Sequence, residues 1–401
     1  MDPNHLIPEL ARPSDHKIVF VVADGLGGIS GEAAGTELEL AETPHLDQLA
    51  RTGVSGLLDP VAPGITCGSG PGHLALFGYD PLEHDIGRGV LSALGVNVDL
   101  QPDDIAARGN FCRVDAHGHV IDRRAGRLSS GRGAELVRRL RQIKLDGVEL
   151  LLNPVEQYRF SLVLRGPQLG AALEDTDPQA TGVAPLRPRA KDQASQPSAE
   201  LVAQFIDQAA ALLADQADAN MVLLRGFDKR PSLPSMRDRY GLNACAIAEY
   251  PMYRGLARLL GMHAIDLEGP GLEVQVDTLA RVWDDYDFFF FHFKATDSAG
   301  EDGDFQAKVS AIAELDMYIG RITALRPEVL VVTADHSTPS QLRAHSWHPV
   351  PVVLTASTCR RDSATRFGET ACLHGGLGRM PTKQLMGVAL AHAGRLRKYG
   401  A

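Results

Sequence analysis

The sequence has few cysteines and no long apolar run, and each absence excludes a class of protein. The 5 cysteines are scattered, and no two of them form a Cys-x-x-Cys pair. A disulfide framework and a thiolate zinc site are therefore not expected, and a reducing compartment fits. Glu9, Arg12 and Asp15 lie where a signal peptide needs an apolar segment, and no apolar run is long enough to span a bilayer. We expect a cytoplasmic protein with no membrane partner.

An excess of positive charge is also missing. Lysine and arginine total 40, against 50 aspartate and glutamate residues, which gives a formal net charge of -10. A general nucleic-acid binder needs a broad basic face, so we expect no nucleic-acid partner. A small anionic substrate remains possible, because a local basic pocket can lie on an acidic protein. The 401 residues, 44% of them hydrophobic, are enough for two domains.

Several apolar segments are typical of buried strands of a mostly parallel sheet. Three of them lead directly to polar side chains: 17–23 to Asp24, 287–293 to Lys294 and Asp297, and 329–332 to Asp335 and His336. The carboxyl ends of parallel strands meet at one edge of a sheet, so these side chains are expected to converge. A fourth apolar segment, 349–354, is preceded by His345 and His348.

Carboxylates and imidazoles in such numbers are typical of a metal site. This mixture of ligands suits Mn²⁺, Zn²⁺ or Mg²⁺ better than a soft metal. More than four such groups favour two ions, which together can stabilise a phosphoryl group during transfer.

Ser69 is the candidate nucleophile. It lies in Gly64-Ile65-Thr66-Cys67-Gly68-Ser69-Gly70-Pro71-Gly72-His73, just before the apolar residues 74–77. Such a loop holds a side chain at the start of a helix, where free backbone amides can receive an anion. Upstream, a capping Thr43 and a proline at position 44 predict another helix after the first strand.

The character of the chain changes between about residues 82 and 260. Nine arginines occur from Arg108 to Arg141, alternating segments at 158–164 and 221–224 suggest a second sheet, and 175–200 is rich in Pro, Gln and Ser and predicts a surface loop. We expect an α/β fold with a mostly parallel sheet flanked by helices. Its core, 1–82 and 260–401, is interrupted by a smaller inserted α+β domain, 83–259, which we expect to bind substrate.

Five segments together resemble one family, the archaeal-type, cofactor-independent phosphoglycerate mutases of the alkaline phosphatase superfamily. The resemblance runs from about residue 17 to 386 and includes the inserted domain. Its segments are Val22-Ala23-Asp24-Gly25, Thr43-Pro44-His45-Leu46-Asp47, Gly68-Ser69 followed by His73-Leu74-Ala75-Leu76-Phe77-Gly78-Tyr79-Asp80-Pro81, Asp122-Arg123-Arg124-Ala125-Gly126-Arg127, and Ala334-Asp335-His336-Ser337-Thr338-Pro339.

The resemblance implies a role for each matching residue. Asp24, Asp335 and His336 would hold one ion, and Ser69 would touch that ion and become phosphorylated transiently. Asp297 and His345 would hold a second ion, and Lys294 would lie near the phosphoryl group. The implied cofactors are two divalent ions, Mn²⁺ first, with Mg²⁺, Zn²⁺ or Co²⁺ as alternatives.

Three positions depart from the family pattern. Glu301 stands where relatives carry His, Gly70 where they often carry Asp, and His348 where they usually carry Asp. We interpret Glu301 as an oxygen ligand of the second ion and His348 as an additional or substitute ligand. The alternatives are a solvated acidic turn for Glu301 and a packed structural histidine for His348.

Other candidates have plainer alternatives. His292 is expected to be a core histidine, and His73 to serve helix packing or to support the site. Arg123, Arg124 and Arg127, in a turn-rich segment, are predicted to bind substrate through guanidinium contacts to carboxylate or phosphate. Arg108 is a further candidate, with Arg159 and Arg225 weaker ones.

The function that the resemblance implies is interconversion of 3-phosphoglycerate and 2-phosphoglycerate, in glycolysis and gluconeogenesis, through a phosphoserine. The partner would be a small phosphorylated three-carbon acid, and the sequence does not fix the oligomeric state. The alternatives are another metal-dependent phosphotransferase or phosphohydrolase of the superfamily, or a catalytically inactive metabolite-binding relative.

Overall fold

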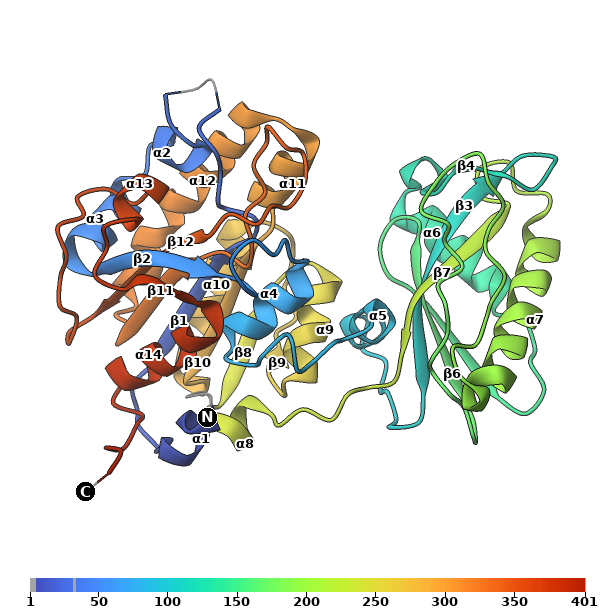
Figure 1. The fold of residues 1–401 in the computed structure, drawn as a ribbon, viewed down its shortest axis with the longest axis horizontal. Coiled ribbons are helices and arrows are strands. Elements are labelled where there is room, and N and C mark those ends of the chain that lie inside the picture. The colour runs from blue at the N-terminus through green and yellow to red at the C-terminus, as the bar shows by residue number, and fades with distance from the viewer. Residues whose placement is uncertain (1–4, 32–33, 401) are drawn as a thin grey trace. The chain divides into compact units, whose positions relative to one another are not determined.

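The computed structural model describes residues 5–31 and 34–400. The chain divides into two compact units (Figure 1). Unit 1 comprises Met1–Asp85, Pro234–Glu249 and Leu260–Ala401, and unit 2 comprises Ile86–Leu233 and Tyr250–Leu259.

Unit 1 is built on an eight-stranded, mostly parallel sheet in the order β13-β2-β12-β11-β1-β10-β8-β9. Only β12 runs antiparallel to its neighbours β11 and β2. The strands are β1 (Ile18–Ala23), β2 (Val54–Asp59), β8 (Ala244–Ile247), β9 (His263–Ala264), β10 (Phe288–Phe293), β11 (Val329–Thr333), β12 (Val350–Ala356) and β13 (Gly378–Pro381).

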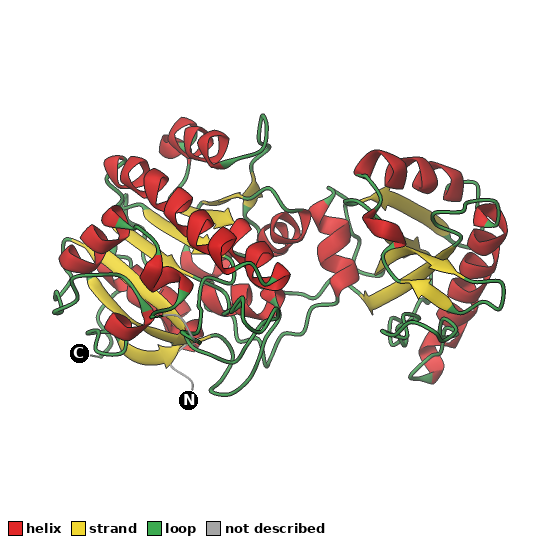
Figure 2. Ribbon diagram, turned by 90° about the horizontal axis from the view of Figure 1, so that it is seen from above, coloured by secondary structure: helices red, strands yellow, loops and turns green. Residues whose placement is uncertain are grey.

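Helices cover both faces of this sheet (Figures 1 and 2). α12 contacts α2, α3, α10 and α11, whereas α4 and α14 meet at η5. The helices are α1 (Ile7–Leu10), α2 (Glu37–Leu40), α3 (Pro44–Thr52), α4 (Ser69–Leu76), α8 (Met236–Tyr240), α10 (Leu272–Arg281), α11 (Ala295–Asp302), α12 (Phe305–Ala324), α13 (Glu369–Cys372) and α14 (Leu385–His392), with short 3₁₀ turns η4 (Trp283–Asp285) and η5 (Thr382–Gln384).

The central strands of unit 1 explain why the sheet is covered on both sides. All side chains of β1, β10 and β11 are buried, and their sequences are nearly continuous apolar runs. Strands of this composition need helices on both faces, as the sequence predicts. β1 lies between β10 and β11 in the middle of the sheet, so the ends of these three strands lie side by side.

The direction of β12 brings a further segment to the same edge. Because β12 is antiparallel to β11, its amino end lies where β11 has its carboxyl end. The residues that precede β12, including His345, are therefore delivered to the edge that carries Asp335.

Unit 2 contains an antiparallel sheet in the order β4-β3-β6-β5, with β7 also paired to β3. One face of this sheet packs under α6 and α7 and forms an apolar core that includes Phe111, Phe160 and Phe205. The elements are α5 (Arg88–Gly95), β3 (Ile105–Val114), β4 (Val120–Asp122), η2 (Ala125–Arg127), α6 (Ser130–Leu140), β5 (Glu149–Pro154), β6 (Arg159–Arg165), η3 (Gln193–Ser195), α7 (Gln196–Leu213), β7 (Met221–Asp228) and α9 (Pro251–Leu259).

The predicted fold class is confirmed: a mostly parallel, helix-flanked sheet accompanies a smaller unit with its own antiparallel sheet. Two details differ from expectation. The segment 175–200 is not all loop, because α7 begins at Gln196. Residues 234–249, expected in the inserted domain, cluster with unit 1, because β8 pairs with β10. No helix in the described residues is long and apolar enough to cross a membrane.

The start of α3 is stabilised by a residue distant in sequence. Thr43 occupies the N-cap position as predicted, but its side chain makes no capping hydrogen bond. Instead the buried carboxylate of Asp316, on α12, accepts hydrogen bonds from the backbone amides of His45 at 3.1 Å and Leu46 at 2.7 Å. A carboxylate at this place satisfies amides that have no partner within the helix.

Replacing Asp316 should therefore destabilise unit 1, whereas replacing Thr43 should not. We expect Asp316→Ala to lower the free energy of unfolding by roughly 1–2 kcal/mol, as for loss of a helix cap. The matched control is Thr43→Val, which keeps the shape and removes a hydroxyl that has no hydrogen-bond partner in the described part of the chain. Urea unfolding of both variants measures the difference, and equal losses would contradict the assignment of the cap.

Candidate active site

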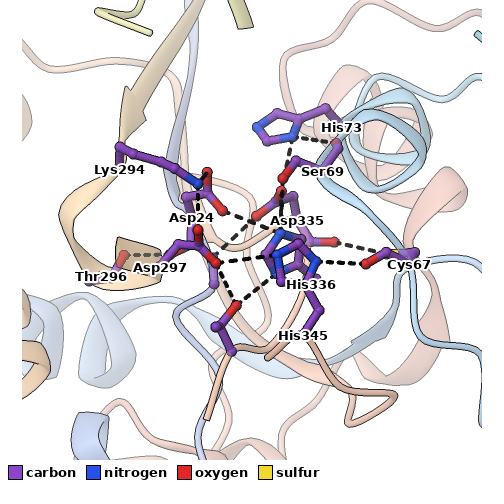
Figure 3. A network of polar contacts seen from close by, with 12 residues as sticks. Asp24, Cys67, Ser69, His73, Lys294, Thr296, Asp297, Asp335, His336 and His345 are labelled. Atoms are coloured by element: carbon purple, nitrogen blue, oxygen red, sulfur yellow. Dashed lines mark hydrogen bonds and ion pairs between the residues drawn. The ribbon is translucent and has the colours of Figure 1, made fainter. Parts of the chain in front are cut away.

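Two buried carboxylates form the centre of the site in unit 1. Asp24 directly follows β1 and Asp335 follows β11 closely. Both are 0% exposed, and Figure 3 shows them beside His336. Burial alone would raise the pKa of Asp24, but the charge of Lys294 and contacts with His292 and His336 hold that pKa well below its usual range. Asp335 behaves similarly: burial and the neighbouring Asp24 oppose ionisation, and His336 and His73 outweigh them and lower the pKa. The lowered pKa values favour the ionised form of both side chains.

His336 lies between these carboxylates and Ser69. Its Nε2 is 3.3 Å from Asp24 Oδ1, 3.2 Å from Asp335 Oδ2 and 3.1 Å from the hydroxyl of Ser69. Burial lowers the pKa of the imidazole, and the two carboxylates only partly offset that effect. A neutral imidazole beside two carboxylates is the protonation state that a divalent cation requires of its ligands.

A second cluster adjoins the first. Asp297, on α11, is fully buried and lies 3.5 Å from His345 Nε2, whose ring stacks on His336 with centroids 3.6 Å apart. Glu301, one turn after Asp297, is mostly exposed and places Oε1 3.8 Å from the same His345 nitrogen. His345 Nδ1 is held 2.9 Å from the carbonyl of Cys67.

The donor sets of both clusters fit a divalent cation. In Asp24, Asp335 and His336, and likewise in Asp297, His336 and His345, one ligand atom from each residue lies within 4.8 Å of the others. Oxygen and imidazole nitrogen are the donors that hard and borderline divalent metals prefer. His336 belongs to both sets, so the two clusters are adjacent and have one candidate ligand in common.

Lys294 links the carboxylates of the two clusters. It follows β10, and its Nζ contacts Asp24 Oδ2 at 3.0 Å and also Asp297 Oδ2. Burial would lower the pKa of the ammonium, but the charges of Asp24 and Asp297 raise it above the ordinary value. Lys294 is therefore a permanent positive charge that remains partly open to solvent.

Ser69 is the first residue of α4, as the glycine-rich segment predicts. The helix can approach Asp335 closely because position 72 is glycine: a Cβ there would lie 2.3 Å from the Asp335 carbonyl oxygen. His73, one turn later, places Nδ1 2.8 Å from the Ser69 carbonyl oxygen and 3.2 Å from Asp335 Oδ2. The half-buried hydroxyl of Ser69 thus faces the carboxylates from a fixed position.

A buried lysine holds the loops that carry these ligands. Lys308, on α12, is 0% exposed, and its Nζ donates to the carbonyls of Gly25 at 2.9 Å, Gly27 at 3.1 Å and Thr338 at 2.8 Å. Sequence reasoning missed this residue. A signal exists, because Lys308 and Asp316 fall among the buried positions of an otherwise apolar helix stripe, where an unpaired charge is costly.

The structure also places His348, a candidate metal ligand, and His292, an expected core histidine. His348 lies outside both clusters: its Nδ1 is 3.0 Å from Ser346 Oγ, and its ring stacks on Trp347. His292, expected to be a core histidine, is buried, but its Nε2 lies 3.3 Å from Asp24 Oδ2, so it also borders the site.

Unit 2 carries a group of arginines on the sheet face opposite its apolar core. Arg108 on β3 pairs directly with Arg225 on β7 and with Ser161 on β6, and Arg159 is paired with Asn110. Side chains two residues apart share a face, so the three arginines lie together. Burial, then the charges of Arg88, Arg159 and Arg225, lower the pKa of Arg108 to about 10.

The arginines of this face lie opposite one another, and Asp175 and Asp177 lie 3.6 and 3.5 Å from Arg225. Like charges placed directly opposite each other destabilise a sheet. In the described part of the chain, buried atoms of the same face also lack hydrogen-bond partners: Arg108 Nε, Asn110 Oδ1, Arg159 Nε, Ser161 Oγ and Arg225 Nε. A bound carboxylate or phosphate would accept hydrogen bonds from the three guanidinium groups and from the Ser161 hydroxyl, whereas Asn110 Oδ1 needs a donor.

Arg123, Arg124 and Arg127, predicted from the turn motif to bind substrate, lie outside the sheet positions that carry Arg108, Arg159 and Arg225. Arg123 makes a two-point contact with the buried Asp177, at 2.9 and 2.7 Å, and Asp177 also lies 3.5 Å from Arg225. Arg124 and Arg127 are exposed in the turn around η2. Of the four predicted substrate-binding arginines, only Arg108 lies directly on the arginine face.

Fold and site together define a class. It is that of an α/β protein with a mostly parallel sheet, with carboxylates and imidazoles that could hold divalent ions at the carboxyl edge, and with a serine at a helix start beside them.

Comparison with known proteins narrows the class to a family. The family model of 2,3-bisphosphoglycerate-independent phosphoglycerate mutase matches residues 50–218. Curated relatives described as "Probable 2,3-bisphosphoglycerate-independent phosphoglycerate mutase" include one from Thermus thermophilus, 48% identical with 100% of both chains covered. Another, from Aquifex aeolicus, is 44% identical, with 99% of this chain and 100% of the relative covered.

Two solved structures have a similar fold over nearly the whole chain. The cofactor-independent phosphoglycerate mutase from Thermoplasma acidophilum is 27% identical, with a TM-score of 0.70 over 94% of this chain and 100% of that chain. A protein from Pyrococcus horikoshii is 28% identical, with a TM-score of 0.83 over 96% of this chain and 99% of that chain. The chain belongs to the 2,3-bisphosphoglycerate-independent phosphoglycerate mutase family.

The arginine face yields a prediction about stability. Arg108→Met removes one of the opposed charges and keeps an apolar stem, so in buffer without multivalent anions the variant should be more stable by roughly 0.2–1 kcal/mol. Added sulfate or phosphate should raise the thermal midpoint of the wild type more than that of the variant. The matched control is Arg138→Met, an exposed arginine of α6. An equal response to anions in wild type and Arg108→Met, measured by thermal unfolding, would contradict anion binding at this face.

Proposed function

We propose that this enzyme interconverts 3-phosphoglycerate and 2-phosphoglycerate without 2,3-bisphosphoglycerate, through a phosphoserine formed on Ser69. The observation that carries the proposal is the position of Ser69, whose hydroxyl is 3.1 Å from His336 beside Asp24 and Asp335, in a chain of this family. A nucleophile next to clustered metal ligands is suited to phosphoryl transfer.

In the proposed reaction, the Ser69 hydroxyl loses its proton, Oγ attacks phosphorus to form the Oγ–P bond, and the ester O–P bond of 3-phosphoglycerate breaks. The glycerate alkoxide that leaves takes up a proton. The 2-hydroxyl of the same glycerate then loses its proton and attacks the phosphoserine, so that the Oγ–P bond breaks and 2-phosphoglycerate forms. The reverse direction uses the same steps.

The metal ligands proposed for this chemistry are Asp24, Asp335 and His336 with Ser69 for one ion, and Asp297, His345 and Glu301 for the other. Divalent ions bound there, for which Mn²⁺ is our first choice, would neutralise phosphoryl oxygens and favour loss of the serine proton. Lys294 would place its charge against a phosphoryl oxygen, which its position beside Asp24 and Asp297 supports.

The arginines of unit 2 are proposed to hold the acid. Arg108, Arg159 and Arg225 would bind the carboxylate of glycerate, and Arg123 would act through Asp177, which it shares with Arg225. Arg124 and Arg127 are exposed and remain candidates for contact with the substrate. A mutase must keep glycerate bound between the two transfers, and a charged binding face serves that need.

Catalysis through Ser69 has a direct test. Ser69→Ala should lower the mutase rate by more than about 10³-fold, as expected for loss of a nucleophile, in an assay coupled to enolase with added Mn²⁺. Ser363→Ala, an exposed loop serine, is the control and should retain the wild-type rate. Release of inorganic phosphate from 3-phosphoglycerate without mutase activity would instead indicate a phosphohydrolase. Tight binding without any turnover would indicate an inactive relative.

The ligands of the second ion can be separated by metal analysis. Glu301→Ala should reduce bound Mn²⁺ from two ions to one per chain, because Glu301 lies 3.8 Å from His345 Nε2 at the edge of the second cluster. His348→Ala is the matched control and should keep two ions, because His348 contacts Ser346 and Trp347. Two ions in both variants would exclude Glu301 as a ligand, and loss of an ion from His348→Ala would make His348 one.

A further inference from the structure

Thr338 lies between the two clusters of candidate metal ligands. It follows Asp335 and His336 in the chain and is 0% exposed. Its hydroxyl oxygen is 2.7 Å from Asp297 Oδ1, in the second cluster, and 3.0 Å from Nδ1 of His336, which belongs to both clusters. One hydroxyl group therefore contacts a ligand of each cluster.

The direction of both hydrogen bonds follows from their chemistry. A carboxylate only accepts, so the single proton of the Thr338 hydroxyl goes to Asp297. The hydroxyl oxygen can then only accept from His336, so Nδ1 of His336 must carry the ring proton. In a neutral imidazole this leaves Nε2 as an unprotonated acceptor.

The consequence appears on the other side of the ring. Nε2 of His336 faces Asp24 Oδ1 at 3.3 Å and Asp335 Oδ2 at 3.2 Å. An unprotonated nitrogen and two carboxylate oxygens repel one another unless a cation lies between them. Thr338 thus sets His336 in the tautomer that can serve as a ligand.

Backbone hydrogen bonds hold Thr338 in place, and two neighbouring glycines permit its close approach. Its amide nitrogen is 3.1 Å from the carbonyl oxygens of both Gly25 and Gly27, and its own carbonyl accepts from Lys308 at 2.8 Å. A Cβ at Gly25 would lie 2.5 Å from the Thr338 hydroxyl oxygen, and one at Gly300 would lie 2.2 Å from its carbonyl oxygen. Glycine at both positions therefore leaves the space that the hydroxyl and the carbonyl of Thr338 occupy.

We propose that Thr338 is a positioning residue that couples the two metal clusters: its hydroxyl orients Asp297 and fixes the tautomer of His336, so each cluster forms fully only when the other is ordered. The coupling rests on the proposed function, since it concerns the ions of that reaction. Partners of this kind orient ligands from outside the coordination sphere and raise metal affinity.

The experiment compares Thr338→Val, which keeps the shape and removes the hydroxyl, with Thr338→Ser, which keeps the hydroxyl. Mn²⁺ is titrated into metal-free protein by calorimetry, and ¹⁵N NMR of labelled histidine reports which nitrogen of His336 is protonated. In Thr338→Val we expect affinity about 10–100-fold lower at both clusters and a His336 proton no longer confined to Nδ1. Thr338→Ser should resemble the wild type in both measurements.

A matched control loses a buried hydroxyl elsewhere on the same segment. Thr333 is also 0% exposed, and its hydroxyl donates to the Pro351 carbonyl at 3.0 Å, away from the ligands. Thr333→Val should keep wild-type Mn²⁺ affinity, whatever its stability. Wild-type affinity in Thr338→Val, or equal weakening in Thr338→Ser and Thr338→Val, would overturn the coupling alone. A wild-type protein that binds no Mn²⁺ would contradict the proposed function and the coupling with it.

Discussion

Charge balance around three buried carboxylates is the constraint on which the rest of unit 1 depends. Asp24, Asp297 and Asp335 are all 0% exposed and lie at one edge of one sheet. Like charges in an interior of low dielectric constant repel strongly, and burial of each costs free energy unless it is compensated. Lys294 compensates two of them, imidazoles border all three, and Lys308 fixes the loops that carry them. These contacts offset the repulsion between the carboxylates and hold the loops that carry them.

The sequence alone predicts that Asp24, Asp335 and Ser69 are candidate site residues, because strand ends and glycine-rich loops are local features. Asp24 and Asp335 each follow an apolar run, and Ser69 lies among glycines, so residues and neighbours in sequence identify them. The convergence of His345 with these groups depends on the antiparallel direction of β12, which its apolar residues do not encode. Likewise, Thr43 was a sound capping residue by type, yet Asp316, far along the chain, takes that role.

Strand register explains why the grouping of arginines on one face of unit 2 could not be predicted from the sequence. Arg123, Arg124 and Arg127 share a recognisable turn, whereas Arg108, Arg159 and Arg225 are separated in sequence and meet only because β3 pairs with both β6 and β7. Period-two alternation can assign each arginine to a face of its own strand, but not to a partner on another strand. A charged face assembled by strand pairing is therefore harder to recognise from sequence than one assembled by a loop.

The strand order of unit 1 also determines when this chain can fold during synthesis. β1 is made first, but both of its neighbours, β10 and β11, belong to the last third of the chain. Most of unit 2 emerges from the ribosome as the continuous segment 86–233, so its sheet can form while β1 still lacks partners. An apolar strand whose partners are synthesised this late presents unpaired edges, and such edges favour aggregation. The same central position that gathers the buried carboxylates therefore leaves the first strand exposed until the last third of the chain is made.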